Sequence, residues 1–395
     1  MMGWEVRLSP AGIFWSERQI TRAEGCYLYD ETGAAVLDFS GGQGTVPLGY
    51  GHPAILAAVQ QQLWQLMHDP FPLAHTAAAA ALAASLASLL PESLNAFFWS
   101  ATHERAWLAA VDLARQISGK PFVISVQEGA GGLADFTVPY PHPAAGGWPG
   151  RATAADSLAA LERLLASDVT AGRTAAVVIE PVLSGGCVAP PLEFWRELQG
   201  LCRQHHLFLI GDERGSAWGR TGSLFAWQHT GITPDVLVWG EGLAAGLPAS
   251  GLAAAADMMR AWQPAVPFSL NPLAAAAATA TLDMLRQDDL LANAAARGEQ
   301  LRSALRAWQA HSPFLGEVHG QGVMVGLEMG VPARGPDGYL AARVQEECLT
   351  RALWLPTAGS DNHVLCWNPP LTVTVAQIDE ALAIFAESLE EVFDT

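Results

Sequence analysis

Short apolar runs alternate with longer amphipathic stretches through the middle of the chain. The runs consist almost entirely of aliphatic and aromatic residues, which is typical of strands buried on both faces of a parallel sheet. They span residues 96–99, 122–126, 175–179, 207–211 and 236–239. Residues 102–117 and 192–205 have the apolar spacing of helices. This alternation predicts an α/β fold whose mostly parallel sheet is covered by helices.

The two ends of the chain have a different pattern. Residues 26–29 and 35–39 read as strands around a turn, and the C-terminal third is rich in helical spacing with short strands near 323–327 and 363–367. We expect both ends to form one smaller α+β domain. The predicted organisation is residues 1–50 as the N-terminal part of the small domain, 51–273 as the large domain, and 274–395 as the C-terminal part of the small domain.

One uncharged segment, Phe71–Leu90, has about the length of a membrane-spanning helix. It is mostly alanine and is interrupted by Pro72, His75 and serines, so its tendency to insert is weak. We interpret it as a buried helix of a globular domain and expect no membrane association.

Composition narrows the function classes. The chain has 395 residues, of which 39 are acidic and 21 basic, giving a net charge of −18. Such a charge disfavours nucleic acids and anionic membrane surfaces as partners. The five cysteines are scattered without metal-ligand spacing, and the first residues lack the apolar core of a signal peptide. We therefore expect a cytoplasmic protein without a structural metal.

Ligands of parallel sheets bind beyond the carboxyl ends of the strands, so the turns there should carry the chemistry. After Ile210 the sequence reads GDERGSAWGRTG, and TPDVLVWGEGLAAGLP follows. With YLYDETGAAVLDFSGG, LGYGHPAILAAVQQQL, VVIEPVLSGGCVAPP, NPLAAAAATATL, GQGVMVGLE and NPPLTVTVAQIDEAL, in this order, they resemble the class III aminotransferases, a pyridoxal phosphate (PLP) family. The resemblance extends over nearly the whole chain. It implies fold type I, with a large domain around a seven-stranded-type sheet.

The resemblance also implies roles for individual residues. In the family an aspartate protonates the pyridine nitrogen of PLP, a small-residue turn at a helix start binds the phosphate, and a lysine forms the Schiff base. Asp212 stands at the place of the aspartate, and residues 100–102 (Ser100, Ala101 and Thr102) at that of the phosphate turn. Glu241 stands at the place of the Schiff-base lysine. A carboxylate cannot form that bond.

Other family features are also absent. Ala130 and Gly131 lie where a ring-stacking aromatic is expected, and Pro267 lies where a threonine would reach the phosphate. The place of the arginine that receives the substrate carboxylate falls within Leu365, Cys366 and Trp367. We therefore expect no covalently held cofactor, and we treat noncovalent binding of PLP or pyridoxamine phosphate as the weaker alternative.

Arg214 replaces a small apolar residue of the family directly after the acidic pair. A guanidinium there could pair with Glu241, with Asp212 or with both, which would offset the cost of buried carboxylates. Our catalytic candidates are Glu241, Arg214 and His103, although His103 also fits an ordinary residue at a helix start. Trp218 and Trp239 fit either core packing or a pocket for a flat ligand.

Three functions remain open from the sequence. The first is a pseudoenzyme, a class III fold kept as a partner subunit of an active homologue or a pathway enzyme. The second is a biosynthetic enzyme that uses the old cleft without PLP, with Glu241, Arg214 and His103 in acid-base and anion-binding roles. The third is an aminotransferase-like enzyme with noncovalent PLP or pyridoxamine phosphate. The resemblance implies a homodimer in each case.

Overall fold

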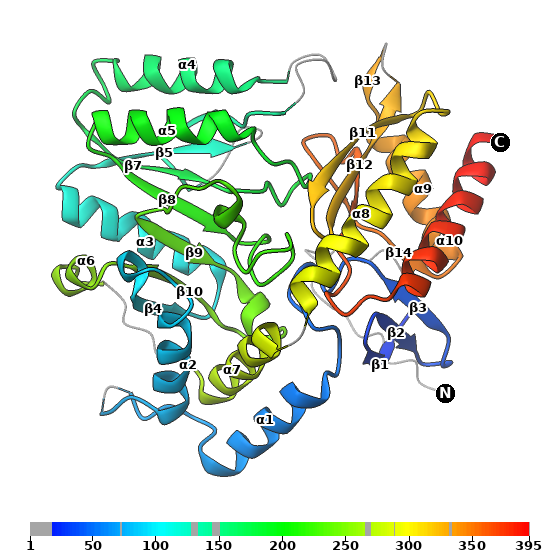
Figure 1. The fold of residues 1–395 in the computed structure, drawn as a ribbon, viewed down its shortest axis with the longest axis horizontal. Coiled ribbons are helices and arrows are strands. Elements are labelled where there is room, and N and C mark those ends of the chain that lie inside the picture. The colour runs from blue at the N-terminus through cyan, green and yellow to red at the C-terminus, as the bar shows by residue number, and fades with distance from the viewer. Residues whose placement is uncertain are drawn as a thin grey trace, which may run out of the picture.

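The computed structural model describes residues 18–71, 73–127, 133–143, 151–264, 270–287, 289–331 and 334–394. Figure 1 shows a larger body built on one extended sheet and a smaller body beside it that contains both ends of the described chain. The larger sheet contains seven strands: β4 (Ala96–Ser100), β5 (Phe122–Gln127), β6 (Phe136–Pro139), β7 (Thr174–Ile179), β8 (Phe208–Glu213), β9 (Val236–Trp239) and β10 (Ser250–Ala254).

The strand order in this sheet is β4-β10-β9-β8-β7-β5-β6. Neighbours from β9 to β6 are parallel, whereas β10 runs antiparallel to both β9 and β4. The mostly parallel, seven-stranded sheet predicted from the sequence is therefore confirmed. All carboxyl ends of β5, β7, β8 and β9 lie at one edge, which is where the site is found.

Helices cover both faces of the sheet because successive residues of its strands point to opposite sides. Ala176 and Val178 of β7 pack with α3 (His103–Ser118), while Val177 and Ile179 pack with α4 (Ala154–Leu165) and α5 (Leu192–Gln204). The short helix α6 (Ala256–Ala261) lies beside α3. Since β7 is buried along its whole length, its sequence shows no polar alternation.

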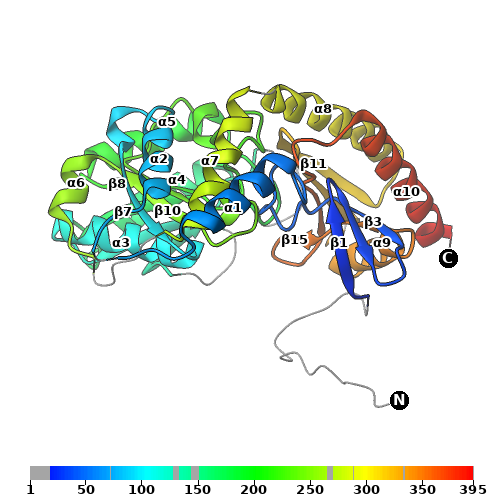
Figure 2. The same ribbon diagram turned by 90° about the horizontal axis from the view of Figure 1, so that it is seen from below.

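The smaller body joins the two ends of the chain. Strands β1 (Ile20–Glu24), β2 (Tyr27–Asp30) and β3 (Ala35–Asp38) form a sheet with β14 (Leu353–Trp354), and Leu37 pairs in parallel with Leu353. A second sheet contains β11 (Leu315–Gln321), β12 (Met324–Val331), β13 (Gly335–Pro336), β15 (Thr357–Ala358) and β16 (Val364–Trp367). Three helices, α8 (Leu290–Gln309), α9 (Gly338–Thr350) and α10 (Val375–Asp394), complete this α+β body, as predicted. Figure 2 shows α8 and α10 along its outer side.

Three helices remain next to the larger sheet: α1 (Pro53–Gln65), α2 (Ala77–Ala87) and α7 (Pro272–Gln287). Helix α7 packs against both α1 and α2. The uncharged segment that we considered for a membrane span thus contains α2, which buries Leu82 and Leu86. No described helix combines the length and apolar character that a membrane crossing requires. The predicted domain boundaries at 50/51 and 273/274 stay a prediction.

Candidate active site

A cavity of about 320 Å³ opens at the carboxyl ends of β5, β7 and β8, beside the start of α3. Its polar lining includes three carboxylates, a guanidinium, an imidazole and an amide, from Glu104, Glu180, Asp212, Arg214, His103 and Gln127. The apolar wall includes Trp107, Leu133 and Val178. This is the edge of the sheet at which parallel α/β proteins bind ligands.

Asp212 is the buried acid of the cavity, with 2% of its surface exposed. Its Oδ1 lies 2.7 Å from His103 Nε2 and accepts the backbone N–H of Arg214 at 3.1 Å, while the Arg214 guanidinium lies 3.4 Å from Oδ2. Burial alone would raise the pKa of Asp212, but the His103 hydrogen bond and the Arg214 charge outweigh it, so this pKa is lowered. Asp212 is therefore ionised, and His103 Nε2 is the ring nitrogen that donates.

His103 begins α3 because the residues before it form a well-defined cap. The Thr102 side chain accepts the N–H of Arg105 at 3.5 Å, and Ser100 Oγ donates to the Thr102 carbonyl at 2.5 Å. The backbone N–H of His103 points away from the helix and donates to Glu241 Oε1 at 2.8 Å. A carboxylate is well placed there, because the first N–H groups of a helix are unpaired and carry partial positive charge.

Glu241 reaches this position through the tight turn after β9. A side chain at Gly240 would place its Cβ 2.8 Å from the Arg214 carbonyl oxygen, so only glycine fits where the two strand ends approach. Glu241 then opens the short 3₁₀ helix η3 (Glu241–Ala244). The turn brings its carboxylate to the start of α3, far away in the sequence.

Arg214 pairs with two carboxylates of the cavity. Besides Asp212, its Nε lies 4.0 Å from Glu180 Oε1, and half of the Arg214 side chain is exposed. Of the ion pairs that we predicted for Arg214, the one with Asp212 is present. The one with Glu241 is not formed among the described residues, because the Glu241 carboxylate binds the start of α3 instead.

The structure brings together most of the residues predicted for the site. His103, Asp212, Arg214 and Glu241 lie around the cavity or at its edge, and Ser100 and Thr102 shape the helix start with Ala101 between them. Leu365, Cys366 and Trp367 are buried in β16. Ala130, Gly131 and Pro267 lie outside the described residues.

Sequence reasoning missed Glu180 as a member of the site. It follows β7 directly, accepts the N–H of Ser184 at 2.9 Å, and also accepts the hydroxyl of the same residue. Burial and the nearby charge of Asp212 raise the pKa of Glu180. Its place at the carboxyl end of a parallel strand was a signal that could have identified it.

The two tryptophans of interest belong to the core. Trp218 and Trp239 are buried, their ring centroids lie 5.9 Å apart, and Trp99 packs at 5.8 Å from Trp239. Neither Trp218 nor Trp239 lines the cavity. Core packing, rather than a pocket for a flat ligand, therefore describes both residues.

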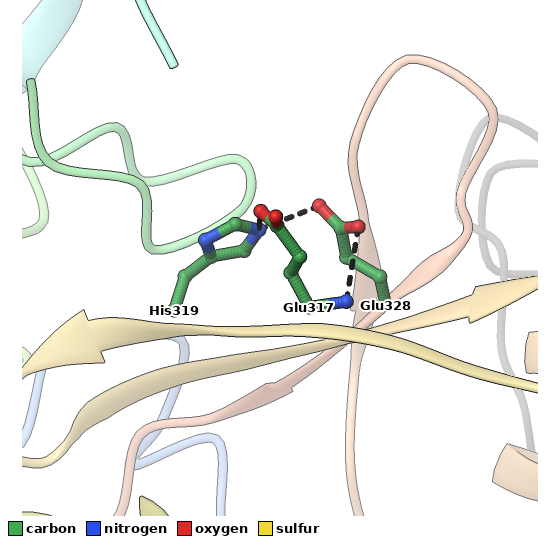
Figure 3. Close-up of side chains that lie close together, drawn as sticks. All are labelled: Glu317, His319 and Glu328. Atoms are coloured by element: carbon green, nitrogen blue, oxygen red, sulfur yellow. Dashed lines mark hydrogen bonds and ion pairs between the residues drawn. The ribbon is translucent and has the colours of Figure 1, made fainter. Parts of the chain in front are cut away.

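A second charged group lies in the smaller body, where Glu317, His319 and Glu328 point toward one another from β11 and β12 (Figure 3). Their potential ligand atoms lie within 4.8 Å of one another, as in a metal site. However, Arg151 contacts Glu328 directly and lies 3.8 Å from Glu317, so a protein cation already balances these carboxylates. We interpret the group as an ion-pair cluster between the two bodies.

A family model of class III aminotransferases matches residues 14–138 and 133–389. The chain belongs to this family. It is 33% identical to the 5-aminovalerate aminotransferase DavT of Pseudomonas aeruginosa, over 94% of this chain and 93% of that protein. It is 34% identical to the acetylornithine aminotransferase of Thermosynechococcus vestitus, over 94% and 92%. It is 30% identical to the 4-aminobutyrate aminotransferase GabT of Escherichia coli, over 94% and 93%.

Solved structures agree with this family assignment. A transaminase from directed evolution by ancestral reconstruction has a TM-score of 0.86 at 25% identity, covering 95% of this chain and 93% of that one. An (S)-enantioselective omega-transaminase from Thermomicrobium roseum has a TM-score of 0.84 at 25% identity, covering 95% and 92%. The fold is therefore that of PLP-dependent transaminases, as the sequence resemblance implied.

The family assignment corrects our expectation about the cofactor. From the residue replacements we expected no covalently held cofactor and treated noncovalent PLP or pyridoxamine phosphate as the weaker alternative. The relatives and structural neighbours are aminotransferases and transaminases of a PLP-dependent family, and they point to PLP as the cofactor. The expectation was wrong because it inferred the loss of a ligand from the loss of single contacts.

The residues of this chain fit PLP at two places. Asp212 offers a buried, ionised carboxylate on the cavity wall, which suits a protonated pyridine nitrogen. The start of α3 offers the backbone N–H of His103 to an anion, which suits a phosphate group.

Proposed function

We propose that this family member is an enzyme of amino-group transfer that binds PLP or pyridoxamine phosphate in the cavity. Asp212 would pair with the pyridine nitrogen, and the Ser100, Ala101 and Thr102 turn at the start of α3 would hold the phosphate. The observation that carries the proposal is the ionised Asp212, buried in the cavity wall beside that helix start. When bound, the cofactor supplies an electron sink for bonds to the amine-bearing carbon.

The charged side chains of the cavity would orient the substrate and handle protons. Before the cofactor binds, His103 Nε2 donates a hydrogen bond to Asp212 Oδ1, and the half-exposed Arg214 guanidinium can turn toward an anionic group of the substrate. Glu241 can accept a proton as a carboxylate base. The single lysine of the chain, Lys120, follows the opposite end of α3, where its Nζ donates to the His206 carbonyl at 3.0 Å.

We infer that the substrate carries a primary amine. The cavity is lined by three carboxylates, Glu104, Glu180 and Asp212, against one guanidinium, which favours a cationic amino group. The named relatives act on 5-aminovalerate, 4-aminobutyrate and acetylornithine. A small amino acid with a terminal amine fits both considerations.

A second candidate function is that of a cofactor-binding pseudoenzyme, which stabilises an active homologue or pathway enzyme as a partner subunit. Glu241 favours this candidate, because this side chain has no amine with which to react. Turnover of amine donors by the purified protein, with release of the corresponding carbonyl compound, would support the enzyme. Full cofactor binding without any turnover would support the pseudoenzyme.

We also propose a homodimer that forms through α1 and the segment after it. Large apolar side chains are exposed there, with Trp64 85% and Leu73 86% exposed, accompanied by Leu56, Leu63 and Met67. Several large exposed apolar side chains within one segment are typical of an interface. Light scattering of the purified protein tests the dimer, and a W64E variant should shift the mass to that of a monomer.

We propose a cytoplasmic location, because the free, buried cysteines fit a reducing compartment.

Cofactor binding tests the central part of the proposal. Purified protein is mixed with PLP, and the visible absorption and circular dichroism of the bound cofactor are recorded for the wild type and for E241K. We expect the wild type to induce a dichroic signal in the cofactor. We expect E241K to attach the cofactor covalently, measured as added mass after borohydride reduction. A wild type without any cofactor signal at millimolar PLP would contradict the proposal.

A further inference from the structure

One residue, His103, contacts both places at which the cofactor would be held. Its imidazole Nε2 lies 2.7 Å from Asp212 Oδ1, and its backbone N–H donates to Glu241 Oε1 at 2.8 Å. We infer that His103 and Glu241 are internal ligands of the cofactor site, which bind Asp212 and the start of α3 and must be displaced when PLP enters. This inference rests on the proposed function.

The carboxylate of Glu241 occupies the place at the start of α3 at which the phosphate of PLP would bind. Helix α3 is 16 residues long, and the His103 N–H that Glu241 accepts belongs to its first turn. The unpaired backbone N–H groups at a helix start point toward one position, which holds one anionic group. A phosphate dianion at the same place would meet the negative charge of Glu241, so the two anions compete.

The imidazole of His103 occupies the place beside Asp212 at which the protonated pyridine nitrogen of PLP would bind. Both carboxylate oxygens of Asp212 already have partners: Oδ1 receives the His103 ring and the N–H of Arg214, and the Arg214 guanidinium lies 3.4 Å from Oδ2. A pyridinium nitrogen that binds Oδ1 would therefore have to replace the imidazole. The His103 side chain is 14% exposed and lines the cavity, so it has room to turn aside.

The two contacts are coupled because both belong to His103. A movement of the first turn of α3 that releases Glu241 also shifts the imidazole from Asp212. Removing either internal ligand should therefore tighten cofactor binding, and the effects of the two changes should not be additive. The device would keep the buried Asp212 paired until the cofactor arrives.

The test compares dissociation constants for PLP, measured by equilibrium dialysis, in the wild type, E241Q, H103A and E193Q. Glu193 is a matched control, since it is an exposed acid in the first turn of another helix, α5, and does not line the cavity. We expect E241Q and H103A to bind about tenfold more tightly than the wild type, which corresponds to about 1.4 kcal/mol. E193Q should change affinity by less than about threefold, as expected for a solvent-screened, exposed charge that does not line the cavity.

A second readout follows His103 directly. In protein labelled with ¹⁵N at histidine, the Nε2 resonance of His103, assigned with H103A, should report the Asp212 hydrogen bond in the free protein and lose it on saturation with PLP. If the wild type binds PLP but E241Q and H103A bind no more tightly than E193Q, or the resonance is unchanged at saturation, the inference is overturned while the proposed function stands. If neither the wild type nor any variant binds PLP, the proposed function fails, and the competition fails with it.

Discussion

At the scale of single residues, the two buried carboxylates of the cavity differ in how well their negative charge is balanced. Asp212 and Glu180 are both acids at the ends of parallel strands, yet the pKa of Asp212 is lowered and that of Glu180 is raised. The difference arises because Asp212 receives His103 and Arg214, whereas burial and the Asp212 charge dominate at Glu180. One acid is thus fixed as an anion, and the other holds a proton more readily.

Replacing Asp212 should weaken the cofactor site more than it weakens the fold. In D212N the carboxylate partner of a pyridinium is lost, and a hydrogen bond to a charged group contributes about 1.5–3 kcal/mol, so affinity for PLP should fall roughly 10- to 100-fold. Equilibrium dialysis measures this change. D257N, at an exposed aspartate of α6, is the control and should bind like the wild type. Equal affinities of D212N and D257N would contradict the role of Asp212.

Replacing Arg214 should make stability more sensitive to pH. In R214L, Asp212 and Glu180 lose their shared cation, so the pKa values of both in the folded state rise. The native state then loses stability as the pH rises above the carboxylate range near 4. Because Arg214 is half-exposed, we expect a modest loss of about 1–2 kcal/mol at pH 7.

Urea unfolding of R214L at pH 4.5 and pH 7 measures this effect. R214K keeps the charge and should lose less stability than R214L at pH 7. A stability difference between R214L and the wild type that is the same at both pH values would argue against the ion pairs.

At the scale of elements, the strands that could be predicted from the sequence are those with large apolar side chains in the parallel part of the sheet. The predicted strands near 175–179 and 236–239 agree with β7 and β9. Strand β10 was not predicted, because its sequence SGLAA has the small residues that close packing demands rather than β-branched ones. A Cβ at Gly251 would lie 2.6 Å from the Phe98 carbonyl and 2.8 Å from the Trp239 ring.

Contacts between distant parts of the chain could not be predicted for the site either. Asp212, His103, Arg214 and Glu241 could be selected from motifs, but the contact between Glu241 and the start of α3 joins residues 138 positions apart. The contact forms because the fold brings the turn after β9 to the start of α3. For that reason the sequence suggested Arg214 as the partner of Glu241, whereas the structure gives the His103 N–H.

Substitution of Gly251 tests the packing of β10. G251A should destabilise the protein by about 1–3 kcal/mol, because the added methyl group overpacks the strand against β4 and Trp239. Gly200 in α5 provides a matched control, since nothing lies within 4 Å of its Cβ position. G200A should leave stability unchanged or raise it by up to about 1 kcal/mol. Chemical unfolding compares the two, and equal stabilities would contradict the close packing.

At the scale of the whole molecule, charges connect the two bodies away from the cavity. Arg151, which precedes α4 of the larger body, binds Glu328 on β12 of the smaller one, and His319 Nε2 lies 2.6 Å from Glu328 Oε1. Burial would raise the pKa of Glu328, but His319 and Arg151 outweigh it and lower this pKa to about 2. The ion pair therefore persists down to low pH.

This cluster predicts how stability depends on pH. Because the folded pKa of Glu328 is below its ordinary value, its contribution is complete above about pH 4.5 and is lost as the pH falls toward 2. E328Q should lose about 2–3 kcal/mol at pH 7. E317Q, at a more exposed position, should lose less. Urea unfolding from pH 3 to pH 7 measures both, and a larger loss in E317Q would contradict the assignment.

The position of bound PLP is the most direct test of the roles of Asp212, His103 and Glu241. A crystal structure of the wild-type protein grown with PLP would show this position. We predict that the pyridine nitrogen lies within hydrogen-bond distance of Asp212 Oδ1, that the phosphate lies at the start of α3, and that His103 and Glu241 have moved away. Electron density for the cofactor elsewhere, or His103 and Glu241 still bound to Asp212 and α3 beside a bound cofactor, would contradict the account.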